Sequence, residues 1–249
     1  MSKFEYTKFD YIKENLCEIH DKINNAKAKR DTAYNKEVRL MAVTKTVPVE
    51  KINFAVSLGI DLIGENRADE LLAKYDSLEI TKNETDKKIE IHFIGNLQTN
   101  KVRQIIDKVD MIQSVNSVRL AEEINKRADM HNKTMDILVE INIGGEESKI
   151  GVSESECCEF IDALKDFRNL RVCGLMTIPP FEASLDKSDT GIKKYFQRMC
   201  ELRDELAGTG QNSSDIFPLL SMGMSEDFEE AVEYGSNIIR IGTKIFGER

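Results

Sequence analysis

The sequence predicts an α/β fold, a single (β/α)8 barrel of the TIM type with one extra helix at its N-terminus. Short apolar runs, which are typical of buried strands, alternate with amphipathic helical segments along the whole chain. The alternation repeats about eight times at a spacing of roughly 25 residues, as a parallel sheet built from βα units requires. A chain of 249 residues also suits a barrel, because α/β barrels run to roughly 250 residues as one domain. We therefore expect residues 1–249 to form one domain, and an open doubly wound sheet is the alternative.

The first elements follow from apolar periodicity and from the residues at their ends. Residues 9–28 carry an apolar stripe at helical spacing and are expected to form the extra helix. Residues 40–44 are a short apolar run and are expected to form the first strand. The next helix is expected over residues 49–58, because Pro48 stands at its start and Gly59 follows its end, as is usual at helix termini.

The remaining units repeat this order. Further strands are expected at residues 61–64, 89–94, 111–115, 136–141, 172–178, 219–222 and 238–241. Further helices are expected at residues 68–78, 100–109, 118–131, 191–206 and 226–234, and one more after Ser153. Ser153 is expected to cap that helix in a capping box with Glu156, three residues further on. Polar loops between the units are expected at residues 80–88, 144–149, 181–190 and 208–215.

Composition excludes several classes of function. A net charge of −9 and a pI near 5.1 argue against binding of nucleic acid, whose phosphates attract Lys and Arg, and against an anionic membrane surface. No apolar run approaches the roughly 20 residues of a membrane span, and the first residues lack the apolar segment of a signal peptide. Five cysteines without a Cys-x-x-Cys spacing indicate reduced thiols in a cytoplasmic protein. The three histidines fit no metal-ligand spacing, so no zinc site is expected.

Lys45 is the first candidate for chemistry. It closes the apolar run that begins at Arg39 and therefore stands at the carboxyl end of the first strand. Ligands of α/β folds bind at this end of the strands. A lysine held beside apolar neighbours loses its proton more easily and can act as an amine nucleophile. A solvated surface charge is the alternative interpretation.

Two motifs near the C-terminus indicate an anion site. Residues 221–225 end one strand and open a helix, for which Ser225 is the expected N-cap, and residues 240–243 end the last strand. The loops after strands seven and eight of a barrel often bind phosphate. Small residues there let backbone N–H groups approach an anion, and the hydroxyls of Ser225 and Thr243 can donate to it. Tight turns and a helix cap are the alternative interpretation.

Other polar residues at strand ends have less specific patterns. Asn66 follows the second strand and either binds a ligand or caps the next helix. His92 lies in an apolar strand, which favours a core histidine with one satisfied nitrogen over a general base. Glu140 and Asn142 alternate with apolar residues and are expected as satisfied polar core residues near the barrel mouth.

The candidates together fit one cofactor. A lysine on strand one, a phosphate site after strands seven and eight and an arginine beside that site suit a phosphate-bearing aldehyde held as a Schiff base, and pyridoxal phosphate needs these parts. The chain also resembles the pyridoxal-phosphate homeostasis proteins, also called the proline-synthase-co-transcribed family. The stretches that carry the resemblance span nearly the whole chain in order: Ala42-Val43-Thr44-Lys45-Thr46, Gly64-Glu65-Asn66, residues 92–101, Gly174-Leu175-Met176-Thr177, residues 220–225, residues 240–243 and Phe246-Gly247.

The resemblance implies a barrel like the N-terminal domain of alanine racemase and a set of cofactor contacts. It implies a Schiff base on Lys45, phosphate contacts from Ser225, Gly242 and Thr243, an arginine facing the pyridine nitrogen, and Asn66 at the ring. The residues expected to bind the cofactor are Lys45, Asn66, Met224, Ser225, Arg240, Gly242 and Thr243. Some members carry a second lysine two positions after the Schiff-base lysine. Val47 stands there in this chain, which argues against transfer of the cofactor between neighbouring lysines.

Arg240 narrows the expected activity. An always-charged guanidinium is a poor partner for a protonated pyridinium, so the ring nitrogen should stay unprotonated and the cofactor should be a weak electron sink. A racemase also needs a second acid or base, which alanine racemases take from a tyrosine of a C-terminal β domain. The chain ends at Arg249, just after the last expected strand, and none of its six tyrosines lies in a matched motif.

We therefore expect a carrier and regulator of pyridoxal phosphate with little or no turnover. A pyridoxal-phosphate-dependent amino-acid racemase is the alternative, and a cofactor-free lysine Schiff-base lyase is a third candidate. Apo-enzymes that need the cofactor are the expected protein partners, the protein is expected to be cytoplasmic, and a monomer or weak dimer is expected.

Overall fold

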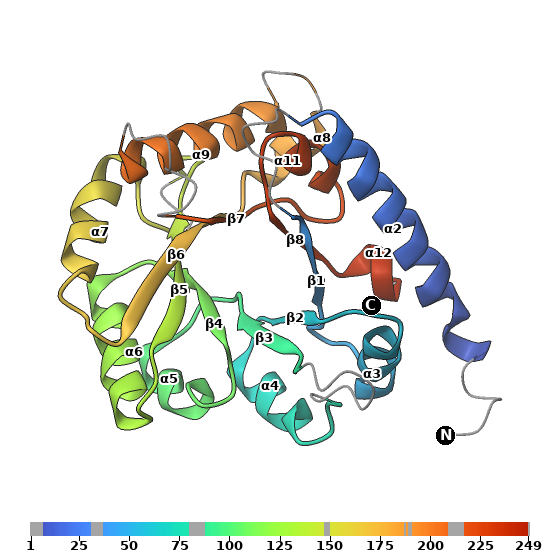
Figure 1. The fold of residues 1–249 in the computed structure, drawn as a ribbon, viewed down its shortest axis with the longest axis horizontal. Coiled ribbons are helices and arrows are strands. Elements are labelled where there is room, and N and C mark those ends of the chain that lie inside the picture. The colour runs from blue at the N-terminus through green and yellow to red at the C-terminus, as the bar shows by residue number, and fades with distance from the viewer. Residues whose placement is uncertain are drawn as a thin grey trace.

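Eight parallel strands form a closed barrel with the helices outside it (Figure 1). The computed structural model describes residues 7–30, 37–79, 88–146, 150–186, 188, 191–208 and 217–248. Each strand pairs with the next along the chain, and β8 pairs with β1 to close the ring. The predicted (β/α)8 barrel is therefore confirmed, and the open doubly wound sheet is wrong.

The strands lie within two residues of their predicted bounds, and the largest difference is at the start of the sixth. They are β1 Arg39–Val43, β2 Leu62–Glu65, β3 Glu90–Phe93, β4 Met111–Val115, β5 Met135–Ile141, β6 Leu170–Thr177, β7 Leu219–Ser221 and β8 Ile238–Ile241. The helices are η1 Thr7–Phe9, α2 Asp10–Ala28, α3 Val49–Ser57, α4 Ala68–Tyr75, α5 Thr99–Ile105, α6 Val118–Met130, η3 Glu154–Glu156, α7 Cys157–Leu164, α8 Phe181–Leu185, α9 Ile192–Ala207, α11 Phe228–Glu233 and α12 Thr243–Phe246.

Two local predictions are wrong. The stretch 181–190, expected as a loop, contains helix α8, which begins after Pro180. A five-residue helix is too short to show a periodic apolar stripe. The capping box at Ser153 does not form either, because the hydroxyl of Ser153 bonds the carboxylate of Glu156 while the Glu156 N–H donates to the Ser153 carbonyl at 3.2 Å. The chain therefore enters α7 through a 3₁₀ turn. Of the other predicted loops, residues 80–87, 147–149 and 209–216 lie outside the described part of the chain.

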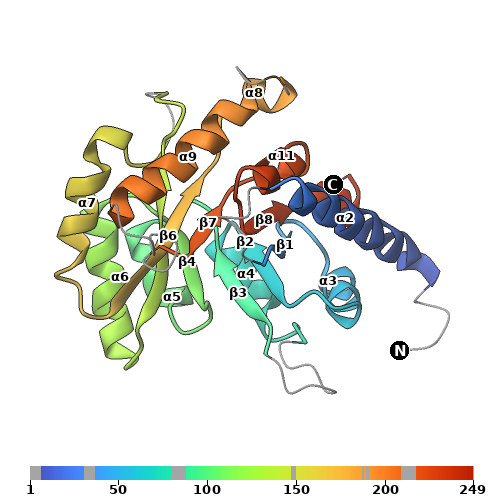
Figure 2. The same ribbon diagram turned by 45° about the horizontal axis from the view of Figure 1, so that its top comes forward.

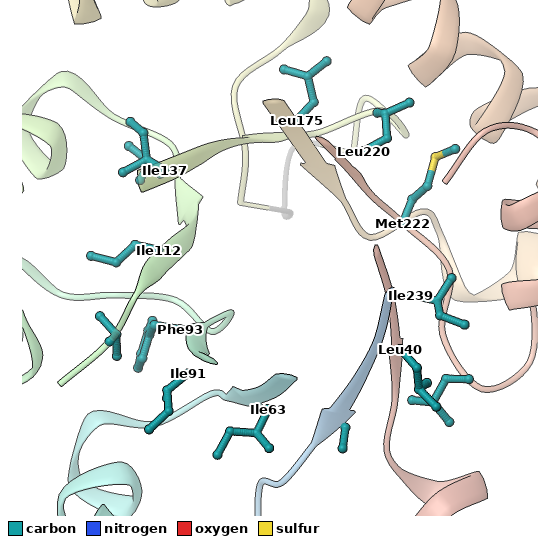
Figure 3. Close-up of a cluster of buried hydrophobic side chains, with 14 of the residues drawn as sticks. Leu40, Ile63, Ile91, Phe93, Ile112, Ile137, Leu175, Leu220, Met222 and Ile239 are labelled. Atoms are coloured by element: carbon teal, nitrogen blue, oxygen red, sulfur yellow. The ribbon is translucent and has the colours of Figure 1, made fainter. Parts of the chain in front are cut away.

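Each strand buries side chains on both of its faces, which explains why the strands read as continuous apolar runs. The outward side chains form the larger core, between the barrel and the helices, and Figure 3 shows many of them pointing away from the barrel axis. Inward side chains such as Met41, Val43 and Met176 form two smaller clusters inside the barrel. The inside layer is also where the buried polar groups of several strands meet.

The extra helix α2 packs beside the last elements of the chain (Figure 2). The hydroxyl of Tyr11 donates to the carbonyl of Phe246 at 3.1 Å, and the amide of Asn15 donates to the carbonyl of Ile245 at 3.1 Å. At the far end of α2, Lys29 pairs with Glu233 of α11 at 2.7 Å. The predicted extra helix thus covers the barrel where its first and last strands meet. Within the described ranges, no helix has the length and apolar character needed to cross a membrane.

Candidate functional site

A cavity of about 300 Å³ opens at the carboxyl ends of the strands, beside β1, β2 and β8. Its volume lies at the lower end of the roughly 300–1,000 Å³ typical of small-molecule sites. All seven residues predicted to bind the cofactor line it. Its lining is Val43, Lys45, Asn66, Ile94, Ile178, Phe181, Ser184, Met224, Ser225, Glu226, Asp227, Arg240, Gly242 and Thr243. The barrel topology thus brings residues from both ends of the sequence into one site.

Lys45 stands two residues beyond the end of β1, in a turn closed by the Val47 N–H donating to the Thr44 carbonyl at 3.0 Å. Its side chain is exposed and lines the cavity. Among the described residues, its amine has no hydrogen-bond or ion-pair partner. Lys45 is therefore an accessible amine at the edge of a cavity that can hold a small molecule.

Arg240 is the buried cation of the site, with 4% of its surface exposed. One terminal nitrogen donates to Ser221 Oγ at 2.7 Å, and the other donates to the Thr177 carbonyl at 2.8 Å. Burial lowers the pKa of the guanidinium to about 10, so it stays charged at neutral pH. The Nε of Arg240 makes no hydrogen bond to a described residue, so its N–H is available to a ligand.

A chain of hydrogen bonds leads from Arg240 down the inside of the barrel. Ser221 Oγ donates to Gln113 Oε1 at 2.6 Å, and the Gln113 amide donates to His92 Nδ1 at 2.9 Å. His92 Nε2 then lies 3.3 Å from Glu90 Oε2. All partners are satisfied when His92 is neutral with its proton on Nε2, and burial lowers the pKa of His92 in agreement. His92 is thus a core histidine, although both of its nitrogens have partners rather than one.

The loop after β7 differs from the prediction at Ser225. Helix α11 begins later than expected, and its N-cap residue is Asp227, so Ser225 as N-cap is wrong. The Asp227 carboxylate accepts the Met224 N–H at 2.6 Å and the Ser184 hydroxyl at 2.6 Å. Because Asp227 shapes this loop, Ser225 is not engaged in capping.

Three backbone donors remain on this side of the cavity. In the described part of the chain, the N–H groups of Ser225, Gly242 and Thr243 have no acceptor. Unpartnered N–H groups beside two hydroxyls are suited to an anion such as a phosphate. Two of the three donors, those of Gly242 and Thr243, stand at the start of α12, where N–H groups are free in any helix, so the phosphate site stays a prediction.

Asn66 does not cap the helix that follows it, because the N-cap of α4 is Arg67. Its Oδ1 is buried and has no partner among the described residues. A buried polar atom without a partner is costly, so a ligand that donates to it would be stabilised. The backbone around Asn66 is tightly packed, because a Cβ on Gly95 would lie 2.0 Å from the Asn66 carbonyl oxygen.

Glu140 lies on β5 in the inner layer and is half-buried, with the Asn116 amide donating to it at 3.3 Å. Burial raises its pKa, although the positive charge of Arg240 works in the opposite direction. Glu140 is thus the satisfied polar residue that the strand pattern predicts. Its carboxylate also favours the charged form of Arg240.

Sequence reasoning did not predict the other seven residues that line the cavity. Phe181 and Ser184 come from the segment taken for a loop, and Glu226 and Asp227 come from the helix start that was placed too early. Val43, Ile94 and Ile178 come from expected strands, whose apolar residues gave no sign of facing the cavity. Asp is a usual N-cap residue, and Asp227 stands only two positions after Ser225, so Asp227 could have been found. Ser184 could not, because its bond to Asp227 joins residues 43 apart in the chain.

The barrel and the lysine just past its first strand define a class of protein, the alanine-racemase-like barrels. The family model described as "Alanine racemase, N-terminal domain" matches residues 21–249. The "Pyridoxal phosphate homeostasis protein" of Aquifex aeolicus is 41% identical over 236 residues, which cover 95% of this chain and 97% of that protein. The chain therefore belongs to the pyridoxal phosphate homeostasis protein family, as the sequence motifs predicted.

Two solved structures are similar over nearly the whole chain. A protein from Bifidobacterium adolescentis is 32% identical, with a TM-score of 0.85 over 99% of this chain and 97% of its own. PipY of Synechococcus elongatus, solved with PLP bound, is 27% identical, with a TM-score of 0.75 over 95% of this chain and 100% of its own. The barrel is thus shared from end to end with experimentally determined folds.

Proposed function

We propose that this protein binds pyridoxal phosphate as a Schiff base on Lys45 and carries the cofactor, with little or no catalysis. The observation that carries the proposal is the convergence of all seven predicted residues on one cavity. The amine of Lys45 has no partner among the described residues, so it is available to an aldehyde. PipY, which is similar over its whole length, was solved with PLP bound.

The residues present fit the remaining parts of the cofactor. The free N–H groups of Ser225, Gly242 and Thr243 would hold the phosphate, together with the two hydroxyls. Met224 would line the site beside them, and the orphaned Oδ1 of Asn66 would accept a hydrogen bond from the ring substituents.

Arg240 decides between a carrier and an enzyme. When bound, pyridoxal phosphate supplies an electron sink whose strength depends on protonation of its ring nitrogen. Arg240 is buried but stays charged, and its free Nε would donate to an unprotonated ring nitrogen. This arrangement keeps the sink weak and disfavours transamination and decarboxylation.

The lining of the cavity also favours the carrier over a racemase. A two-base racemase needs a second acid or base on the far side of its substrate from the lysine. Of the described residues that line the cavity, none is a tyrosine, histidine or cysteine. The two carboxylates of that lining are those of Glu226 and Asp227, and that of Asp227 is occupied by the Met224 N–H and by the Ser184 hydroxyl. Steady inversion of a single amino-acid enantiomer by the holo-protein, at enzymatic rates, would nevertheless overturn the carrier proposal.

The first experiment is the absorbance spectrum of the purified protein mixed with pyridoxal phosphate. We expect visible absorbance that borohydride abolishes and a reduced adduct whose mass maps to Lys45. Lys45→Ala should remove both signals. A colourless wild-type protein with no adduct would refute the proposal and favour the cofactor-free lyase.

Cofactor delivery defines the proposed partners. Apo-enzymes that need pyridoxal phosphate would receive the cofactor from this protein, acting as a monomer or weak dimer in the cytoplasm. The cysteines at positions 17, 157, 158, 173 and 200 are all free thiols, which suits a reducing compartment. Faster reactivation of an apo-enzyme by the holo-protein than by the amount of free cofactor it releases would support delivery.

A further inference from the structure

The turn that carries Lys45 contains a strained residue. Thr46 has a φ of 59°, in the left-handed region where a β-branched side chain is a rare outlier. Lys45 and Thr46 form the centre of the turn between Thr44 and Val47. A turn with positive φ at its third residue usually carries glycine there. Contacts from outside the turn must therefore hold Thr46 in this conformation.

Helix α4 supplies those contacts. The Glu70 carboxylate accepts the Thr46 N–H, and the Lys74 amine donates to the Thr44 carbonyl at 2.7 Å. Lys74 and Glu70 also pair with each other at 2.6 Å. The two side chains thus bind the backbone immediately before and immediately after Lys45.

The pair is well shielded from solvent. The side chain of Lys74 is 11% exposed and that of Glu70 is 19% exposed. The third partner of Lys74 is Glu65, at 3.1 Å, whose side chain is 1% exposed. Burial works against ionisation of Glu70, but the hydrogen bonds from Lys74 and from the Thr46 N–H outweigh it and lower its pKa. Glu70 is therefore ionised at neutral pH.

The two lysines near the turn have different chemistry. The amine of Lys74 is engaged by three acceptors, in Thr44, Glu65 and Glu70. Lys45 has no partner among the described residues. Lys74 is thus suited to hold the turn, and Lys45 is suited to react.

We propose that Glu70 and Lys74 form a clamp that keeps Thr46 left-handed and thereby directs the amine of Lys45 into the cofactor cavity. Glu70 and Lys74 are positioning residues in this proposal and touch no cofactor. The proposal rests on the proposed function, since it assigns Lys45 as the residue that holds the cofactor.

A pair of substitutions tests the clamp. Glu70→Ala removes the acceptor of the Thr46 N–H and should raise the dissociation constant for pyridoxal phosphate roughly tenfold, equivalent to about 1.4 kcal/mol. Thr46→Gly removes the strain, because glycine adopts positive φ freely. In a Thr46→Gly chain, the further change Glu70→Ala should weaken binding only about threefold or less. Absorbance titration gives the dissociation constant for pyridoxal phosphate of four proteins: the wild type, Glu70→Ala, Thr46→Gly and the double variant.

The same four proteins are unfolded in denaturant without cofactor. We expect Glu70→Ala to lower the midpoint more in the wild-type chain than in the Thr46→Gly chain. The matched control is Asp69→Ala, which removes a neighbouring carboxylate of α4 that pairs with Lys101 and is 77% exposed. Asp69→Ala should leave cofactor binding unchanged, both in the wild-type chain and in the Thr46→Gly chain.

Equal effects of Glu70→Ala with and without Thr46→Gly, in both assays, would overturn the clamp. A wild-type protein that forms no reducible bond to Lys45 would instead overturn the proposed function. In that case the unfolding measurements would still decide whether Glu70 holds Thr46 in place.

Discussion

Arg240→Met separates the contribution of the buried charge to folding from its contribution to binding. The two hydrogen bonds from the guanidinium to Ser221 and Thr177 stabilise by about 1.5–3 kcal/mol each, as bonds from a charged donor do. Burial opposes them, because it lowers the pKa of Arg240 from 12.5 to about 10, and each pKa unit corresponds to about 1.36 kcal/mol. The remaining net stabilisation is small, and methionine fills most of the vacated volume.

We therefore expect Arg240→Met to change the free energy of unfolding of the apo-protein by about 3 kcal/mol at most, since a buried charge is often nearly neutral for stability. The same change should weaken binding of pyridoxal phosphate roughly 30-fold or more, because a buried charged hydrogen bond is lost. Urea unfolding measures the first effect and absorbance titration the second. Arg203→Met is the matched control, because Arg203 is also buried but does not line the cavity. If Arg240→Met lowered the free energy of unfolding by more than about 5 kcal/mol and left cofactor binding unchanged, Arg240 would be a structural residue and the reasoning would be refuted.

Three further substitutions test other parts of the site. Gly95→Ala should displace the Asn66 backbone, which a Cβ would approach to 2.0 Å, and should weaken cofactor binding severalfold in the same titration. Glu140→Gln should stabilise the apo-protein at neutral pH, because burial raises the pKa of Glu140 and its ionisation in the folded state therefore costs stability. That gain should vanish well below pH 4.5, where the carboxyl is protonated in both states, and a gain that persists there would contradict this account. Glu90→Gln should cost about 1 kcal/mol near pH 7 after allowance for partial exposure. Bonds from His92 and Arg39 lower the pKa of Glu90 from 4.5 to about 2, so the cost should disappear as the pH falls through that range, as acid unfolding curves of both proteins would show.

Sequence reasoning predicted the barrel because its evidence is repeated in every unit. Each strand is a mainly apolar run and each long helix carries one apolar stripe, so one misplaced boundary leaves the order of elements unchanged. Short elements have no such redundancy. Helix α8 has five residues and α12 has four, and neither is long enough to show a helical period.

The convergence of the seven predicted residues on one cavity was predictable for a related reason. A closed parallel barrel brings the carboxyl ends of all its strands together, so Lys45, Asn66 and the residues after β7 and β8 had to meet once the strand order was known. Residues inside strands carry no such signal. Gln113 and Ser221 interrupt otherwise apolar strands, and they are 108 positions apart in the chain, yet they bond each other at 2.6 Å.

The clamp on Lys45 shows why the supporting residues escape sequence reasoning. Glu70 and Lys74 lie four residues apart on α4, where such a pair usually means a solvated helix face. Their importance depends on the φ of Thr46, and nothing in the residue type indicates a left-handed backbone, since threonine disfavours it. A sequence can reveal which side chain meets a ligand, because chemistry restricts the residue type. It does not reveal which distant pair holds that side chain in place, because many ordinary pairs could do so and only the folded backbone selects one.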